Sequence, residues 1–153
     1  MKLALLTLTA AATVASAQAR VDSTRMAVTA GFNEVATWVT KSADMVPADK
    51  YAYKPVNTVR SFGELAAHVA DGMNWYCGQA TGKKTPWSDA TEKGKTDKAT
   101  VVAALTKAVA ACNAQYSGTG KFQPLMANVA HTSLHYGNII TYLRMMGMVP
   151  PSS

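Results

Sequence analysis

The stretch PLMANVAHTSLHYGNIITYLRMMG, residues 124–147, predicts a long helix with a polar inner face. Pro124 suits the first turn of a helix, and Gly147, followed by a Pro-Pro pair, ends one. Apolar side chains recur at helical spacing: Leu125, Val129, Leu134, Ile139 and Leu143. Beside them runs a polar face: Asn128, His131, His135, Asn138 and Tyr142. Such a helix packs in a bundle, and polar groups buried there must find partners.

Further helices are expected upstream. The first runs over residues 22–45, with Asp22 or Ser23 as its N-cap and Pro47 just after its end. The second begins at Ser61-Phe62-Gly63-Glu64, because a serine followed three residues later by a glutamate is a capping box. Each of these signals marks a helix end rather than a strand.

A third helix is expected from Thr96 or Asp97 to about Tyr116. Residues 81–95, between the second and third helices, are rich in Gly, Lys and polar side chains and predict an exposed loop. Strand-like alternation of polar and apolar residues is not evident anywhere in the sequence. The predicted fold class is therefore all-α, a four-helix bundle with a long loop between helices two and three.

The composition is that of one globular domain. A chain of 153 residues has the size of a single domain, and a hydrophobic content of 48% excludes a disordered chain. Two cysteines exclude a cysteine-based zinc finger. Apolar runs of about 18 residues are missing after the N-terminal segment, so stable membrane insertion is not expected. The net charge of +6 is scattered, which favours a solvated loop around the lysines of residues 83–98 over a nucleic-acid partner.

Residues 1–19, MKLALLTLTAAATVASAQA, have the pattern of a secretory signal peptide. Lys2 supplies the positive start, residues 3–14 form the apolar run, and Ala15-Ser16-Ala17 is a cleavage site of small residues. Cleavage is expected after residue 17, or after Ala19 in a second register. The single domain is then residues 18–153, exported to the periplasm or the medium, where disulfides persist. The alternative is an N-terminal helix that packs on the rest of the chain.

The chain has three histidines, and all three are expected to face the interior. His131 and His135 are four residues apart, so they lie one above the other on their helix. His68 lies on the inward stripe of the second helix. Three imidazoles from two facing helices can bind a divalent metal and leave one coordination position open for water. The alternative is that they are structural histidines of the core.

A general base is not evident beside these histidines. The segment His131-Thr132-Ser133-Leu134-His135 lacks the glutamate of the H-E-x-x-H zinc proteases. Asp71, three residues after His68, is a weak candidate for a catalytic, proton-transfer or ligand-orienting group. Otherwise Asp71 is a solvated or packing residue. Glu64 is also near His68 in sequence, but it is assigned to the capping box.

Three segments together resemble the DinB family of small four-helix metalloproteins. The first is Tyr53-Lys54-Pro55 with residues 59–65, VRSFGEL. The second is residues 68–71, HVAD, with the Tyr76-Cys77 pair that follows. The third is residues 131–151, from HTSLHYG through YLR to GMVPP. The likeness covers nearly all of the chain after the signal peptide.

The resemblance implies a bundle of DinB-like type in which the second and third helices run parallel. It implies a metal triad of His68, His131 and His135, with nickel or zinc as the metal. Characterised members of that family include thiol-dependent transferases and an isomerase. These properties belong to the family and are expectations for this chain.

The parallel arrangement of the second and third helices determines whether the two cysteines can meet. Cys77 ends the second helix and Cys112 ends the third, so both lie toward the same end of the bundle. In an exported protein they are expected to form a disulfide; the alternative is two small buried hydrophobic side chains. Three methionines near the C-terminus, at 145, 146 and 148, either fill the core or form a surface for a homodimer.

These observations predict an exported DinB-like metalloprotein that binds one divalent metal, zinc or nickel, through three histidines. An ion with an open position favours a metal-dependent hydrolase or transferase acting on a small molecule. The alternative is a non-enzymatic protein of the cell envelope that stores, buffers or senses a metal or takes part in a stress response. A third possibility is an interaction bundle whose histidines bind nothing.

Overall fold

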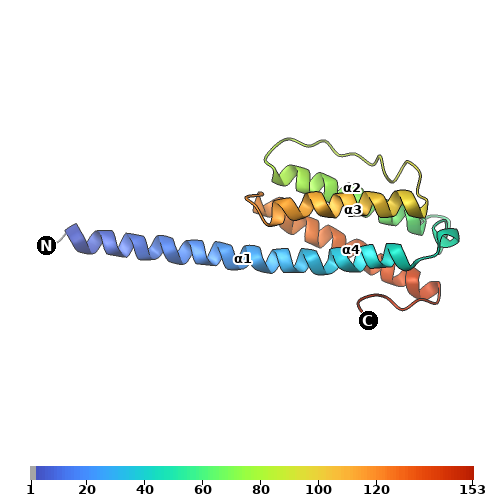
Figure 1. Cartoon of the computed structure of the whole chain (residues 1–153), viewed down its shortest axis with the longest axis horizontal. Coiled ribbons are helices and arrows are strands. Elements are labelled where there is room, and N and C mark those ends of the chain that lie inside the picture. Colours follow the sequence, from blue (N-terminus) through green and yellow to red (C-terminus); the bar gives the residue numbers. More distant parts are fainter. Residues whose placement is uncertain (1–2) are drawn as a thin grey trace.

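The computed structural model describes the backbone of residues 3–153 and the side chains of residues 18–153. Its elements are α1 (Leu3–Met45), a short 3-10 turn η1 (Ala48–Lys50), α2 (Phe62–Ala80), α3 (Lys98–Tyr116) and α4 (Phe122–Met145). Within the described backbone all regular structure is helical. The predicted all-α class and the four-helix bundle are confirmed (Figure 1).

Helix α1 begins far upstream of the start expected from the sequence. The prediction of an N-cap at Asp22 or Ser23 is wrong, because the helix continues through both residues. Their polar atoms bond within the helix instead: Asp22 accepts from the side chain of Gln18 at 2.9 Å, and Ser23 donates to the carbonyl of Arg20 at 2.9 Å. The end near Pro47 is confirmed, since α1 stops at Met45.

The N-terminal part of α1 extends well beyond the other three helices (Figure 1). Lys2 and the side chains of the expected cleavage site lie outside the described residues, so signal-peptide cleavage stays a prediction. Across residues 3–153, none of the helices combines the length and the apolar character that crossing a membrane requires.

The start of α2 confirms the capping box. The hydroxyl of Ser61 accepts from the backbone N–H of Glu64 at 3.1 Å, and the Glu64 carboxylate accepts from the backbone N–H of Ser61 at 2.6 Å. The hydrogen bond from Ser61 and the ammonium of Lys54, 3.0 Å away, hold the pKa of Glu64 below its usual value. These contacts fix where α2 begins, and so which of its residues face inward.

Helices α2 and α3 run parallel. Their C-terminal ends are joined by a disulfide between Cys77 and Cys112, whose Cα atoms are 5.2 Å apart. Their N-terminal ends also meet, since a Cβ atom on Gly63 would overlap the carbonyl oxygen of Thr96. The loop over residues 81–97 therefore runs back along the bundle, as Figure 1 shows. The expected disulfide and the long loop are both confirmed.

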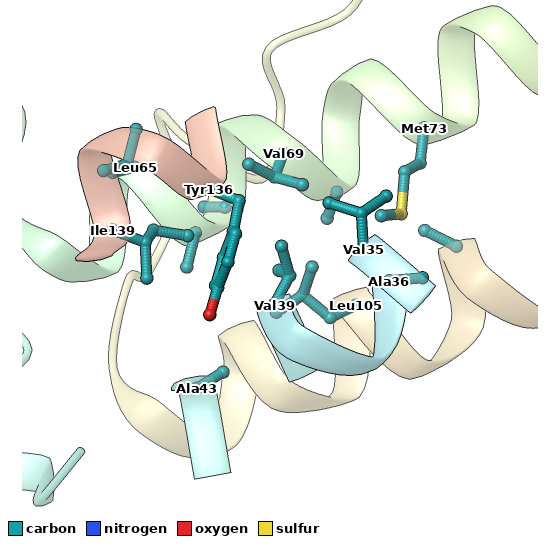
Figure 2. Close-up of a cluster of buried hydrophobic side chains, with 14 of the residues drawn as sticks. Val35, Ala36, Val39, Ala43, Leu65, Val69, Met73, Leu105, Tyr136 and Ile139 are labelled. Atoms are coloured by element: carbon teal, nitrogen blue, oxygen red, sulfur yellow. The ribbon is translucent and has the colours of Figure 1, made fainter. Parts of the chain in front are cut away.

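The core lies between all four helices (Figure 2). It includes Val35 and Val39 of α1, Val69 of α2, Leu105 of α3 and Ile139 of α4. The expected apolar flank of α4 holds except at Leu134, which is 67% exposed on the outer face. Of the methionines near the C-terminus, Met145 is exposed, whereas Met146 and Met148 pack against the core.

Helix α4 ends in a Schellman motif. Gly147 has a φ of 78°, a conformation that glycine adopts without strain. Its N–H donates to the carbonyl of Arg144 at 3.0 Å, and the N–H of Met148 donates to that of Leu143 at 2.9 Å. The tail then folds back on α4.

Candidate metal centre

The structure brings His68, His131 and His135 together. His68 projects from α2, and the other two project from successive turns of α4. The ring centroids of His131 and His135 lie 4.5 Å apart, and His68 lies 5.2 Å from the first and 4.7 Å from the second. One ring nitrogen of each histidine lies within 4.8 Å of the other two, so the cluster could hold a metal ion.

The nitrogen atoms of this cluster have the spacing and protonation that a divalent ion needs. Nε2 of His68 lies 3.3 Å from Nε2 of His131. Two nitrogens that share a tetrahedral ion at about 2.1 Å are about 3.4 Å apart. Nδ1 of His131 and of His135 is buried without a hydrogen-bond partner among the described residues. The three ring nitrogens therefore have the spacing of ligands to a metal that binds imidazole.

Burial lowers the pKa of His131 to about 4, and electrostatic interactions with His135, His68 and Arg60 act in the same direction. Burial likewise lowers the pKa of His135 to about 4, and the charges of His68 and Arg60 act in the same direction. Both rings are therefore neutral near pH 7, which is the form that coordinates metals.

Glu92, in the loop before α3, reaches the cluster although the sequence analysis did not single it out. Its Oε2 lies 2.7 Å from Nδ1 of His68, and its Oε1 accepts from Nε of Arg60 at 2.6 Å. Burial alone would raise the pKa of Glu92, but the hydrogen bonds from Arg60 and His68 outweigh it and lower that pKa. Glu92 is one of three acidic residues in a lysine-rich loop, and an irregular loop has no periodic pattern that could have identified it.

Asp71, the weak catalytic candidate, faces the backbone of the same loop. Its carboxylate accepts from the N–H of Thr91 at 3.1 Å and from the N–H of Glu92 at 2.9 Å. Asp71 is 5% exposed. A catalytic role for Asp71 stays a prediction; its contacts are those of a residue that holds the loop.

Aromatic side chains surround two of the histidines. The ring of Tyr76 lies 5.4 Å from His131, and that of Trp87 lies 5.7 Å from His68. Trp75, 5.8 Å from Trp87, donates from Nε1 to the carbonyl of Thr85 at 3.0 Å. The contacts of Trp87 with His68 and of Trp75 with Thr85 hold the long loop against α2 beside the cluster.

A cleft of about 560 Å³ opens beside the cluster. Its lining comes from the linker before α2, from α2, from the long loop and from α4: Pro55, Thr58, Val59, Arg60, Leu65, Glu92, His135, Asn138, Thr141 and Tyr142. The hydroxyl of Tyr142 donates to the carbonyl of Arg60 at 2.8 Å, which ties the linker to α4. Asn138 and Tyr142, expected on the polar face of α4, thus belong to this cleft.

Asn128, at the other end of that polar face, lies at the disulfide rather than at the cluster. Its Nδ2 donates to the hydroxyl of Tyr116 at 3.2 Å and lies 3.6 and 3.7 Å from the sulfurs of Cys77 and Cys112. The polar face of α4 therefore contacts two different regions of the bundle, the disulfide and the histidine cluster.

A comparison with known protein families matches most of the chain. The DinB superfamily matches residues 36–149, a range that contains all three histidines and both cysteines. The comparisons with curated proteins and with solved structures gave no match. Since the match spans most of the chain, from the second half of α1 to the C-terminal tail, the chain belongs to the DinB superfamily.

Proposed function

We propose that this protein binds one divalent metal through His68, His131 and His135 and acts as a metal-dependent hydrolase or transferase on a small molecule. The observation that carries the proposal is the convergence of three imidazole nitrogens within 4.8 Å, beside a cleft that His135 lines. Three imidazoles suit zinc and nickel, which we propose as the metals.

A bound ion of this kind supplies a Lewis acid that polarises a carbonyl or acidifies a water or thiol. The chain itself supplies the surroundings of a reacting molecule. Arg60 and Glu92 line the cleft as an ion pair, and Asn138 of α4 adds an amide to the lining. Leu65 gives the cleft an apolar surface. A cleft of about 560 Å³ has the size of a small-molecule site.

The cleft favours an enzyme over the alternative of a metal-storing or metal-sensing envelope protein. A storage protein needs ligands that release the ion, and it needs no binding space beside them.

Export is the other part of the proposal. It is supported by the signal-peptide pattern of residues 1–19 and by the disulfide between Cys77 and Cys112.

Elemental analysis by plasma mass spectrometry tests the metal site. The mature protein is purified without an affinity tag from an envelope fraction, beside a His131→Ala/His135→Ala double variant. Leu134→Ala is the matched control, because Leu134 lies between the two histidines but on the exposed face of α4. We expect about one equivalent of zinc or nickel in the wild type and the control, and none in the double variant.

Equal metal in all three proteins would contradict the histidine site. The metal-loaded wild type is then screened with ester, amide and thiol-transfer substrates. Turnover that is lost with the double variant supports the enzyme. A loaded protein that exchanges its ion readily and stays inert on every substrate supports the storage alternative.

A further inference from the structure

Glu92 is linked to His68 by a contact that determines which nitrogen of that histidine is free. Oε2 of Glu92 lies 2.7 Å from Nδ1 of His68. An ionised carboxylate only accepts hydrogen bonds, so Nδ1 carries the proton. In the neutral ring the lone pair is then on Nε2, the atom that lies 3.3 Å from Nε2 of His131. The carboxylate thus turns the unprotonated nitrogen of His68 toward the other histidines.

The backbone of Glu92 is held in place by Asp71. The carboxylate of Asp71 accepts from two consecutive N–H groups of the loop, those of Thr91 and Glu92. Asp71 follows His68 by three residues on α2, so both side chains lie on the same face of that helix. Helix α2 therefore provides the histidine and also fixes the loop that carries its partner.

The side chain of Glu92 is held from a second direction. Arg60 donates to Oε1 at 2.6 Å, while its own carbonyl accepts from the hydroxyl of Tyr142 on α4 at 2.8 Å. The Glu92 side chain is 18% exposed, so water screens these charge-assisted contacts only in part. One carboxylate is thereby tied to α2, to the linker and, through the linker, to α4.

We propose that Glu92 is the positioning residue of the metal centre, and that Asp71 acts through it by anchoring the loop. Glu92 selects the tautomer of His68 that offers Nε2 and restricts rotation of the ring. This inference rests on the proposed metal site. It gives the long loop between α2 and α3 a role at the site, and it gives Asp71 a role without contact to a substrate. Carboxylate partners of metal-bound histidines have this effect in general.

The first test is metal affinity. Cobalt(II) and zinc binding to the mature protein are measured by competition with a chelator for the wild type, Glu92→Ala, Glu92→Gln and Asp71→Asn. Asp89→Asn is the matched control, because Asp89 is in the same loop but its carboxylate pairs with Lys93 at 2.6 Å and makes no hydrogen bond to a histidine among the described residues. Thermal unfolding checks that each variant is folded.

We expect Glu92→Ala to weaken binding about 10- to 100-fold. Glu92→Gln should lose less metal affinity than Glu92→Ala, because its amide oxygen can still accept a hydrogen bond from Nδ1 of His68. Asp71→Asn should weaken binding in the same direction as Glu92→Ala, and Asp89→Asn should match the wild type.

The second test needs no metal. Long-range ¹H–¹⁵N NMR spectra of the metal-free protein at pH 8 distinguish the two tautomers of each histidine. We expect His68 to be protonated on Nδ1 in the wild type and in Asp89→Asn, and to become a mixture of tautomers in Glu92→Ala.

The outcomes separate this inference from the proposed function. If the wild type binds metal and Glu92→Ala binds it equally well with an unchanged His68 tautomer, the positioning role is overturned and the metal site stands. If the wild type binds no metal even when it is supplied in excess, both are overturned.

Discussion

Asn128 and His131 lie one turn apart on α4, yet their surroundings differ. Asn128 is fully buried, donates to Tyr116 and packs on the disulfide. His131 is half-buried and lies beside two other imidazoles, one of which, that of His135, lines an open cleft. We call these two regions the disulfide end and the histidine end. At one end, the polar face of α4 is buried against the disulfide. At the other end, it is accessible from the cleft. The difference suggests that changes at the disulfide end affect stability, and changes at the histidine end affect binding.

The largest effect on stability is expected from removing the cross-link. Replacing both cysteines, Cys77→Ala with Cys112→Ala, frees a loop of 35 residues in the unfolded chain. The free energy of unfolding should fall by roughly 3–4 kcal/mol, measured by urea denaturation. Metal content should stay at that of the wild type at a temperature where the variant is folded. A folded variant that has lost its metal would show that the two ends are not independent.

Metal removal should have the next largest effect, and it acts at the histidine end. Free zinc at 100 times its dissociation constant should stabilise the wild type by about 2.7 kcal/mol relative to the metal-free protein. Differential scanning calorimetry at increasing zinc concentration measures this shift. The double variant His131→Ala/His135→Ala should show no shift. An equal rise in its melting temperature would mean that zinc binds elsewhere.

Gly72→Ala should disturb the histidine end sterically. A Cβ atom at Gly72 would overlap the ring of His131, so that ring must move. We expect a loss of about 1–3 kcal/mol in stability together with weaker metal binding. Gly137→Ala is the matched control, because a Cβ atom there would meet nothing within 4 Å. It should leave binding unchanged and stabilise α4 by up to about 1 kcal/mol.

The smallest effect is expected from Asn128→Leu. This change loses the hydrogen bond to Tyr116, but it also removes Oδ1 of Asn128, which has no partner in the described part of the chain. The hydroxyl of Tyr116 still donates to the carbonyl of Leu125 at 2.8 Å, so no buried donor is left unpaired, and stability should change by less than about 1 kcal/mol in either direction. Metal affinity should equal that of the wild type. A clear loss of metal affinity would show that the disulfide end and the histidine end are energetically coupled.

Local signals in the sequence predicted most of the fold. The capping box at Ser61 and Gly147 at the end of α4 each depend on a few neighbouring residues, and each is found where it was expected. Asp97, one of the two expected starts of the third helix, is the N-cap of α3. The start of α1 was not predicted correctly. Asp22 is a good N-cap only if the residues before it leave the helix, and in this chain they continue it.

The three histidines could be predicted to converge because helical spacing sets which residues share a face. Glu92 could not, because its position depends on the path of the whole loop over residues 81–97. That path is set by contacts between residues far apart in sequence, such as Asp71 with Thr91 and Trp75 with Thr85. Leu134 was also predicted incorrectly. Its apolar side chain predicted burial, but its position on α4 leaves it exposed to solvent.

Trp87 has a consequence for how this protein can be observed. Its indole lies 5.7 Å from the ring of His68 and is 45% exposed, whereas Trp38 of α1 stacks on Tyr136 at 5.3 Å. Indole emission is quenched by a nearby ion with unpaired electrons, and zinc has none because its d shell is full. With the proposed metal bound at the cluster, Trp87 fluorescence would be quenched by cobalt but not by zinc, so the two ions could be distinguished without attaching a dye to the chain.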